Sequence, residues 1–248
     1  MKETPEHAGL SSFTLVLPVW NEREVIEPVV QEILSVPELS SIRLLLVDDG
    51  STDGSAELLD GLAKREARCT VLHLPHGGKD RALWAAFARI ETEWLGIMDS
   101  DGQYDPRDAA ELARRADGGT AAVWGVRASR HDNRWRKIIS RAGRLTKRLI
   151  LGSCTVQDTG CGIWLAQTRF VRDLESLCPQ PAGQVHCHIP ELIRTRGGRI
   201  AEQAIRHRSR LGGQAKYGAL NRMGPGLRSL FQARALLRSA AAAHRSQR

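Results

Sequence analysis

The sequence has no long hydrophobic run, no clustered cysteines and few aromatic residues. No apolar stretch reaches the roughly 20 residues that a membrane-spanning helix needs, and the start, "MKETPEHAGL", lacks the apolar segment of a signal peptide. The five cysteines form no CxxC pair, which is typical of free thiols in a reducing compartment. These absences favour an ordinary globular protein in the cytoplasm, and 248 residues suffice for one domain with a tail.

Two glycine-rich phosphate-binding motifs are also missing. No GxGxxG follows the first predicted strand, which argues against a Rossmann dinucleotide site. The stretch "HGGKD" at 76–80 has the GK pair of a phosphate loop but neither the upstream glycine nor the Ser or Thr of Walker A. A nucleotide bound here would therefore have its phosphates held by a metal ion on acidic residues.

Acidic residues are scarce in two long stretches of this chain of net charge +8. Residues 127–148 contain nine Lys or Arg and one acid, Asp132, and residues 206–248 contain ten and no acid. This asymmetry indicates an anionic partner: a phosphorylated substrate, a membrane surface or a nucleic acid.

Short apolar runs alternate with amphipathic helical patterns, which predicts an α/β fold with a mainly parallel sheet. The predicted strands cover 13–19, 42–49, 69–74, 94–99, 120–127 and 199–208. Helical patterns cover 24–36, 55–66, 80–91, 133–152, 169–177 and much of the tail. Ligands of such sheets bind outside the carboxyl ends of the strands. The polar ends "PVWNE", "VDDGSTDGS" and "MDSDGQ" should therefore meet on one edge.

Three carboxylates lie within seven residues in "IMDSDGQYDP". Asp99 and Asp101 are one residue apart and can reach one cation, with Gln103 as a further oxygen ligand, and this set suits Mg²⁺ or Mn²⁺. An isolated D-x-D is more often a solvated turn whose last acid, here Asp105, caps the next helix. The arrangement of all three strand ends favours the metal site.

The chain resembles glycosyltransferase family 2 over nearly its whole length, on the stretches "LPVWNE", "VDDGSTDGS", "MDSDGQYDP", "VWGVR" and "QDTGCGIWLA". Within that family it is most similar to the dolichyl-phosphate mannose synthases and the bacterial polyprenyl-phosphate glycosyltransferases, through "RKIISR" and "HRSRLGGQAKYG". The resemblance implies a GT-A fold, a Rossmann-like sheet flanked by helices, in residues 13–218. A flexible start (1–12) and a basic amphipathic tail (219–248) complete the expected organisation.

The resemblance also implies roles for individual residues. The nucleotide would be bound by Pro18, Trp20, Glu22, Asp48, Asp49, Lys79 and Asp99. The metal would be held by Asp99, Asp101 and Gln103, and the donor diphosphate by Arg210 and Lys216. The acceptor phosphate would be bound by Arg127, Arg136 and Ser140. Asp101, Asp158, Arg127 and Arg210 are the expected catalytic residues.

The expected activity is transfer of a sugar, with inversion, from GDP-mannose or a UDP-sugar to a polyprenyl or dolichyl phosphate. It would depend on Mg²⁺ or Mn²⁺ and take place at the cytoplasmic face of a membrane. A polyprenyl phosphate is already anionic near neutral pH and needs no general base, whereas a hydroxyl acceptor does. A transferase acting on a hydroxyl, with Asp158 as base, is the alternative.

The apolar faces of the two basic segments could rest on an anionic membrane surface or pack against the sheet. A separate membrane anchor protein would be a further partner. A nucleic-acid-binding module is the remote alternative, because the tail has few aromatics and the acids would then be unexplained. The triplet His186, Cys187 and His188 could bind metal, but its residues alternate along one segment and have no partner ligands in the sequence.

Overall fold

The computed structural model describes residues 10, 12–127, 134–181, 183–209 and 223–246, without the side chains of 134–142, 223–225 and 243–246. Its strands are β1 (Thr14–Val19), β2 (Arg43–Asp49), β3 (Cys69–Leu74), β4 (Trp94–Met98), β5 (Ala122–Arg127), β6 (Ile163–Gln167) and β7 (Ile200–Ile205). They form one sheet in the order β3-β2-β1-β4-β6-β5-β7. Every pairing is parallel except those of β6, which runs antiparallel to β4 and β5.

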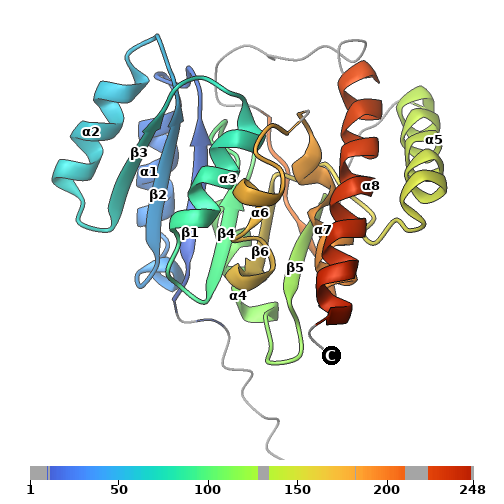
Figure 1. Cartoon of the computed structure of the whole chain (residues 1–248). Coiled ribbons are helices and arrows are strands. Elements are labelled where there is room, and N and C mark those ends of the chain that lie inside the picture. Colours follow the sequence, from blue (N-terminus) through green and yellow to red (C-terminus); the bar gives the residue numbers. More distant parts are fainter. Residues whose placement is uncertain (1–9, 11, 128–133, 182, 210–222, 247–248) are drawn as a thin grey trace, which may run out of the picture.

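Helices cover both faces of the sheet (Figure 1). They are α1 (Ile26–Leu34), α2 (Ser55–Arg65), α3 (Lys79–Arg89), α4 (Pro106–Arg115), α5 (Arg134–Leu151), α6 (Leu174–Leu177), α7 (Ile189–Thr195) and α8 (Met223–Ser246). Short 3₁₀ turns are η1 (Pro37–Leu39), η2 (Thr168–Phe170) and η3 (Val185–His188). On one face α1 contacts α2 and α4, and α3 contacts α6 on the other. The α/β architecture with a mostly parallel sheet is therefore confirmed.

The central strands are buried on both faces, which explains why their sequences are continuous apolar runs. All five residues of β4 and all five of β6 are buried. Two tryptophans, Trp124 of β5 and Trp164 of β6, stack across the strands with ring centroids 4.8 Å apart. This core holds the strand ends, and hence the polar edge of the sheet, in fixed positions.

Helices α5 and α8 pack against each other, and α8 also contacts α7 and η3 (Figure 1). The described part of the predicted tail 219–248 thus rests on the domain through Leu230, Ala233 and Leu236, which are buried. Leu145 and Leu149 of α5 and Leu227 and Phe231 of α8 are instead exposed. In the described residues, no helix is both long enough and apolar enough to cross a bilayer.

Candidate active site at the carboxyl edge of the sheet

The loops after β1 and β2 are tied together by backbone-to-side-chain hydrogen bonds at the upper edge of the sheet in Figure 1. Asn21 adopts a left-handed backbone, and its N–H donates to Ser51 Oγ at 3.0 Å. The N–H of Glu22 donates to Ser55 Oγ, also at 3.0 Å. The Glu22 side chain is buried. The motifs "PVWNE" and "VDDGSTDGS" therefore form one unit, as the strand-end rule predicts.

Asp49, the last residue of β2, holds the loop that follows β3. Its two carboxylate oxygens accept hydrogen bonds from Gly77 N at 2.8 Å and Gly78 N at 2.9 Å. His76 Nδ1 lies 3.0 Å from Asp49 Oδ2. The ring of Trp20 stacks on His76, with centroids 4.5 Å apart and planes 19° from parallel. This aromatic wall beside a carboxylate suits a nucleoside, whose base can stack and whose hydroxyls can donate.

Asp48, unlike Asp49, contacts the loop that follows β2 and His73 of β3. Its Oδ1 accepts from Ser51 N at 3.0 Å, and its Oδ2 lies 3.0 Å from His73 Nδ1. The other nitrogen of His73 lies 3.0 Å from Asp60 Oδ1. Hydrogen bonds to Asp48 and then Asp60 raise the pKa of His73. Asp48 thus holds the β2 loop in shape, beside the predicted nucleoside pocket.

Asp99 and Lys79 bring the ends of β4 and the β3–α3 loop together. Lys79 Nζ donates to Asp99 Oδ1 in a close ion pair. Burial would lower the pKa of Lys79, but Asp99 outweighs it and the pKa is raised, so Lys79 stays charged. Ser100 Oγ donates to the carbonyl of Pro18 at 2.8 Å, which ties the same loop to β1.

The motif "QDTGCG" packs directly on Asp99. Asp99 N donates to Gly162 O at 3.1 Å, and Gly162 N donates to Tyr104 Oη at 2.7 Å. A Cβ atom on Gly162 would lie 2.2 Å from Asp99 Oδ2. The glycine is therefore required for the close approach of β6 to the carboxylate.

Asp101 lies in the turn that follows, and it is nine-tenths buried. Its Oδ1 accepts from Gln103 N at 3.1 Å. The Gln103 amide nitrogen is directed to Arg208 O at 3.4 Å, so this side chain contacts the segment after β7. The role of Gln103 as a metal ligand stays a prediction.

The donor set at this edge fits a divalent metal that arrives with a diphosphate. The described residues contain no group of three His, Cys, Asp or Glu side chains that could hold a metal by themselves. Mg²⁺ and Mn²⁺ are commonly bound by one or two carboxylates, with substrate phosphates and water completing the shell. Asp99 and Asp101 are the two carboxylates predicted for this role, and Lys79 places a positive charge beside Asp99.

Arg127 and Asp158 form a two-pronged ion pair at the end of β5. Arg127 Nε lies 2.6 Å from Asp158 Oδ2, and Arg127 Nη2 lies 2.7 Å from Asp158 Oδ1. Burial would lower the pKa of Arg127, but Asp158 outweighs it and the pKa is raised. Arg127 and Asp158, both predicted site residues, are therefore in contact, and the ion pair restricts the side-chain conformation of each.

Four predicted site residues cannot be placed. Arg210 and Lys216 lie outside the described residues, and Arg136 and Ser140 lie on α5 where only the backbone is described. The segment that leads to Arg210 is nevertheless anchored, because Arg208 pairs with Glu32 at 2.8 Å and with Asp105 at 3.0 Å. Asp105 also accepts from Arg107 N at 3.0 Å and caps α4. Capping of this helix by Asp105 was the alternative to a metal site in the sequence analysis.

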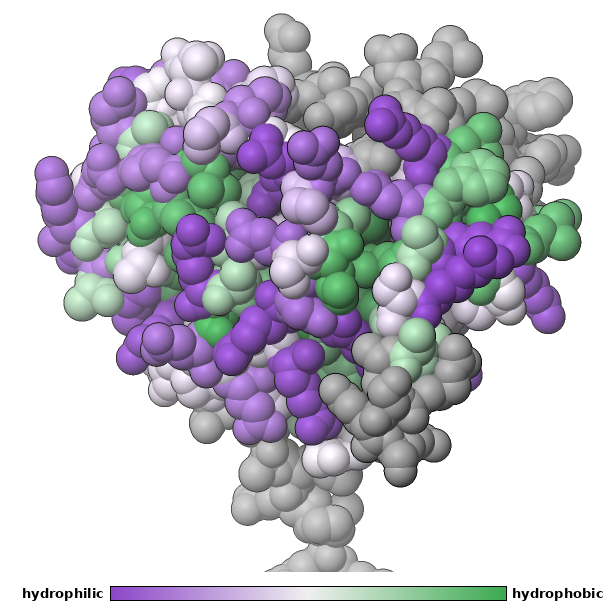
Figure 2. Space-filling view, in the orientation of Figure 1, coloured by the Kyte–Doolittle hydropathy of each residue, from purple (hydrophilic) through white to green (hydrophobic). Residues whose placement is uncertain are grey.

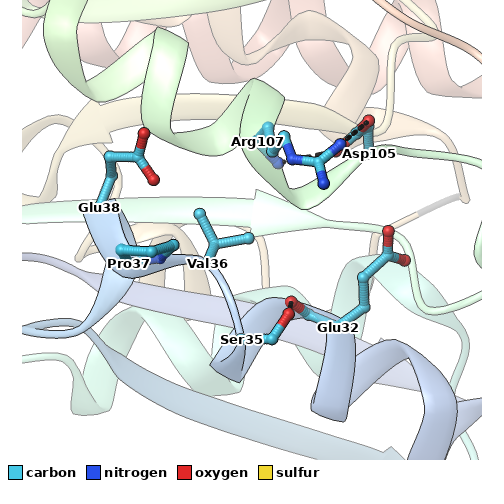
Figure 3. A pocket seen from close by; sticks show the side chains of 7 residues that line it. All are labelled: Glu32, Ser35, Val36, Pro37, Glu38, Asp105 and Arg107. Atoms are coloured by element: carbon cyan, nitrogen blue, oxygen red, sulfur yellow. Dashed lines mark hydrogen bonds and ion pairs between the residues drawn. The ribbon is translucent and has the colours of Figure 1, made fainter.

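A small cavity of about 300 Å³ lies on the helical face between α1, η1 and α4 (Figure 3). Its walls come from Glu32, Ser35, Val36, Pro37, Glu38, Asp105 and Arg107. None of these belongs to the predicted nucleotide, metal or acceptor residues. The cavity is thus separate from the candidate active site.

His76 is the site residue that sequence reasoning missed. It is the second residue after the third predicted strand, so the strand-end rule applied to β3 could have found it. Its pairing with Trp20 depends on β1 and β3 being separated by one strand, β2, which the sequence pattern does not specify.

Residues 14–174 match the family described as Glycosyl transferase family 2. The undecaprenyl-phosphate 4-deoxy-4-formamido-L-arabinose transferase of Enterobacter sp. is 31% identical over 220 residues, 84% of this chain and 63% of that protein. The protein of the same name from Yersinia enterocolitica is 28% identical, over 86% of this chain and 64% of its own length. The chain therefore spans less than two thirds of these relatives.

Two solved structures share the fold. A mannosyltransferase of Pyrobaculum calidifontis, in complex with GDP-Man and Mn²⁺, superposes with a TM-score of 0.64 at 20% identity, covering 98% of this chain and 76% of that one. Glucosyl-3-phosphoglycerate synthase of Mycobacterium tuberculosis, in complex with Mn²⁺, UDP-glucose and phosphoglyceric acid, gives 0.63 at 22% identity, covering 94% and 80%. With its GT-A fold and a family match over most of its length, the chain belongs to glycosyltransferase family 2.

Proposed function

We propose that this protein is a glycosyltransferase that moves a sugar from a nucleotide-sugar donor, GDP-mannose or a UDP-sugar, to a polyprenyl phosphate. The relatives at 31% and 28% identity are named for transfer involving undecaprenyl phosphate, which supports this acceptor class. The donor would lie against Trp20 and His76, with its diphosphate beside Asp99, Asp101 and Lys79. Displacement of the diphosphate by the acceptor oxygen, from the opposite side, inverts the anomeric centre.

The Arg127–Asp158 pair is the observation that carries the choice of acceptor. A hydroxyl acceptor needs a general base, and Asp158 is the candidate. Both oxygens of Asp158 already accept charge-assisted bonds from Arg127, at 2.6 and 2.7 Å, and such bonds stabilise the anion and weaken it as a base. A lipid phosphate needs no base, and it needs positive charge close by, which Arg127 and the basic helix α5 supply.

A divalent cation, when bound, would stabilise the negative charge that develops on the departing diphosphate. The protein's own residues position the donor. Lys79 stays charged beside Asp99, and Asp49 holds the 76–78 loop through the backbone N–H groups of Gly77 and Gly78. Arg136 and Ser140 of α5, with Arg210 and Lys216, are proposed to bind acceptor and donor phosphates.

A direct assay tests this proposal. The purified protein is incubated with undecaprenyl phosphate, a panel of GDP- and UDP-sugars, and Mn²⁺ or Mg²⁺, and the lipid product is identified by mass spectrometry. Product should form with the phosphorylated lipid and not with free polyprenol, and Asp101→Asn or excess chelator should abolish it. Efficient transfer to a hydroxyl acceptor, with Arg136→Ala unaffected, would instead establish the alternative with Asp158 as base.

Association with an anionic membrane surface at its cytoplasmic side is part of the same proposal. Figure 2 shows hydrophobic side chains gathered over α5 and α8, and exposed Leu145, Leu149, Leu227 and Phe231 account for them. Exposed arginines flank them on both helices, including Arg144, Arg148, Arg228 and Arg234. Helices that lie in the membrane–water interface combine apolar side chains with basic residues in this way. A separate anchor protein would dock on this same surface.

A further inference from the structure

A cysteine, a histidine and an aspartate lie in series beside the start of α3. Cys187 Sγ is 3.6 Å from His186 Nε2, and His186 Nδ1 makes a close ion pair with Asp80 Oδ1. Asp80 is buried and also accepts from Val185 N at 2.9 Å and His186 N at 3.1 Å. The imidazole is thus fixed with one nitrogen facing the carboxylate and the other facing the sulfur.

The remaining charges around Cys187 are mostly positive. Lys147 of α5 donates to the Cys187 carbonyl at 2.9 Å, and Lys79 of α3 is near enough to interact with the sulfur electrostatically. His188, the third residue of the triplet, turns away and lies 3.3 Å from Ser229 Oγ of α8. The triplet therefore does not converge on one metal ion.

The charges decide the ionisation of the pair. Burial would raise the pKa of the Cys187 thiol, but the His186 cation and its hydrogen bond outweigh it and lower this pKa. Burial would lower the pKa of His186, but the Cys187 thiolate and Asp80 raise it to about 10. The two shifts favour the thiolate–imidazolium form of the pair, and a partly exposed thiolate is the reactive form of cysteine.

The other four cysteines provide an internal comparison. Cys154 is partly exposed, as Cys187 is, but its thiol donates to Val156 O and burial raises its pKa. Cys69, Cys161 and Cys178 are buried, and burial raises the pKa of each. Lys147 and Arg144 also act on Cys154, but of these two partly exposed cysteines only Cys187 contacts a histidine.

We propose that Cys187 is a modification site, a thiolate held by His186 and Asp80 that hydroperoxides oxidise, and that its oxidation weakens the adjacent nucleotide site. Asp80 follows Lys79 in the first turn of α3, and Lys79 pairs with Asp99. Disturbing the contacts of Asp80 with η3 therefore moves the residue that holds Asp99. The effect on the nucleotide site rests on the proposed function, whereas the reactivity of Cys187 does not.

The chemistry needs only a hydroperoxide. The thiolate sulfur attacks the terminal oxygen, an S–O bond forms and the O–O bond breaks, so that sulfur loses two electrons and the peroxide gains them. His186 gives its Nε2 proton to the departing alkoxide or hydroxide, which leaves as an alcohol or water. The product is a sulfenic acid, which a thiol reductant reverses.

Alkylation of the wild-type protein with iodoacetamide at pH 6.5, followed residue by residue with mass spectrometry, tests the thiolate. Cys187 should react at least about ten-fold faster than Cys154, because an ordinary thiol is about 99% protonated there. Asp80→Asn and His186→Gln should each slow Cys187 towards the rate of Cys154. Equal rates in the wild-type protein, or no change in either variant, would overturn the proposal.

Calorimetry with a nucleotide sugar, before and after stoichiometric hydrogen peroxide, tests the consequence. Oxidation should weaken binding several-fold in the wild-type protein, dithiothreitol should restore it, and Cys187→Ser should bind normally and be insensitive. Unchanged binding by oxidised wild type, or loss of binding in the oxidised Cys187→Ser variant, would refute the switch. If the reduced protein binds no nucleotide sugar, the proposed function and the switch both fail, whereas selective alkylation of Cys187 still stands.

Discussion

Gly162 shows how much of the site depends on one missing side chain. Its Cα sits where any Cβ would lie 2.2 Å from Asp99 Oδ2, and its N–H binds Tyr104 Oη. The glycine permits β6 to approach β4 at the point where Asp99 faces Lys79. The position of this carboxylate is therefore set by a residue 63 positions later in the chain.

Gly162→Ala should displace Asp99 and lower both stability and donor affinity. Overpacking a fitted interior site typically costs about 1–3 kcal/mol of unfolding free energy. Chemical denaturation and calorimetry with a nucleotide sugar measure the two effects. Gly118→Ala is the matched control, since a Cβ there meets nothing within 4 Å. If Gly162→Ala behaves like Gly118→Ala, the close approach described here is wrong.

Helix α5 is attached to α7 through a buried ion pair. Lys147 and Glu191 are 2.7 Å apart, with side chains 5% and 1% exposed. Glu191 also accepts from Thr155 N at 2.9 Å. In the proposed function the basic helix presents its other face to the acceptor, and this ion pair fixes which face that is.

Lys147→Met should destabilise the protein by about 3–5 kcal/mol, because it leaves the Glu191 charge buried without its partner. Urea unfolding followed by circular dichroism gives this number. The double variant Lys147→Met, Glu191→Gln should recover most of the loss, since neither charge remains. A double variant as unstable as the single one would show that the loss comes from packing rather than from charge.

Helix α8 is docked on η3 through a neutral histidine. Ser229 Oγ donates to Gly226 O at 2.8 Å, so His188 Nε2 donates to Ser229, while His188 Nδ1 is buried and has no hydrogen-bond partner in the described part of the chain. Burial, followed by the charges of Lys147 and His186, lowers the pKa of His188 to about 3. Protonation would place a buried charge at Nδ1.

This histidine should make stability fall in acid. Between pH 6.5 and about 3 the unfolded chain binds a proton at His188 that the folded chain does not, so stability is lost as pH falls through this window. The slope is about 1.4 kcal/mol per pH unit for one proton. Unfolding curves at pH 4.5, 5.5 and 7 should be less pH-dependent in His188→Gln than in the wild type. Identical slopes would count against a neutral buried His188.

The elements themselves could be predicted from the sequence to a large extent, because buried parallel strands leave continuous apolar runs. Strand β6 and helix α7 were not predicted. The sequence of β6, "GIWLA", is as apolar as the predicted strands, but periodicity contains no information about strand direction or order. The position of Asp99 and Asp101 at the polar edge of the sheet was predictable, because both follow an apolar strand directly. His76, Tyr104 and Gly162 were not, because their roles arise from contacts between segments far apart in the chain.

At the scale of the whole molecule, four of the five large hydrophobic side chains that are exposed in the described residues lie on α5 and α8 (Figure 2). The protein should sediment with anionic liposomes at low salt and be partly released at high salt, since each basic residue near such a surface contributes about 1 kcal/mol. Leu149→Ser with Phe231→Ser should weaken sedimentation without changing donor affinity. Leu177→Ser, at an exposed leucine on α6, is the control. Equal sedimentation of both variants would exclude this surface.

The place of β6 between β4 and β5 has a consequence for synthesis on the ribosome. Residues 14–98 contain four paired strands, yet β4 keeps one unpaired edge until residues 163–167 have been made. At about 5–20 residues per second, roughly 65 further residues take several seconds. During that interval a fully apolar strand offers its hydrogen-bonding edge to any neighbouring chain, and such edges promote aggregation. The nascent protein is thus expected to need chaperone protection until β6 closes the sheet.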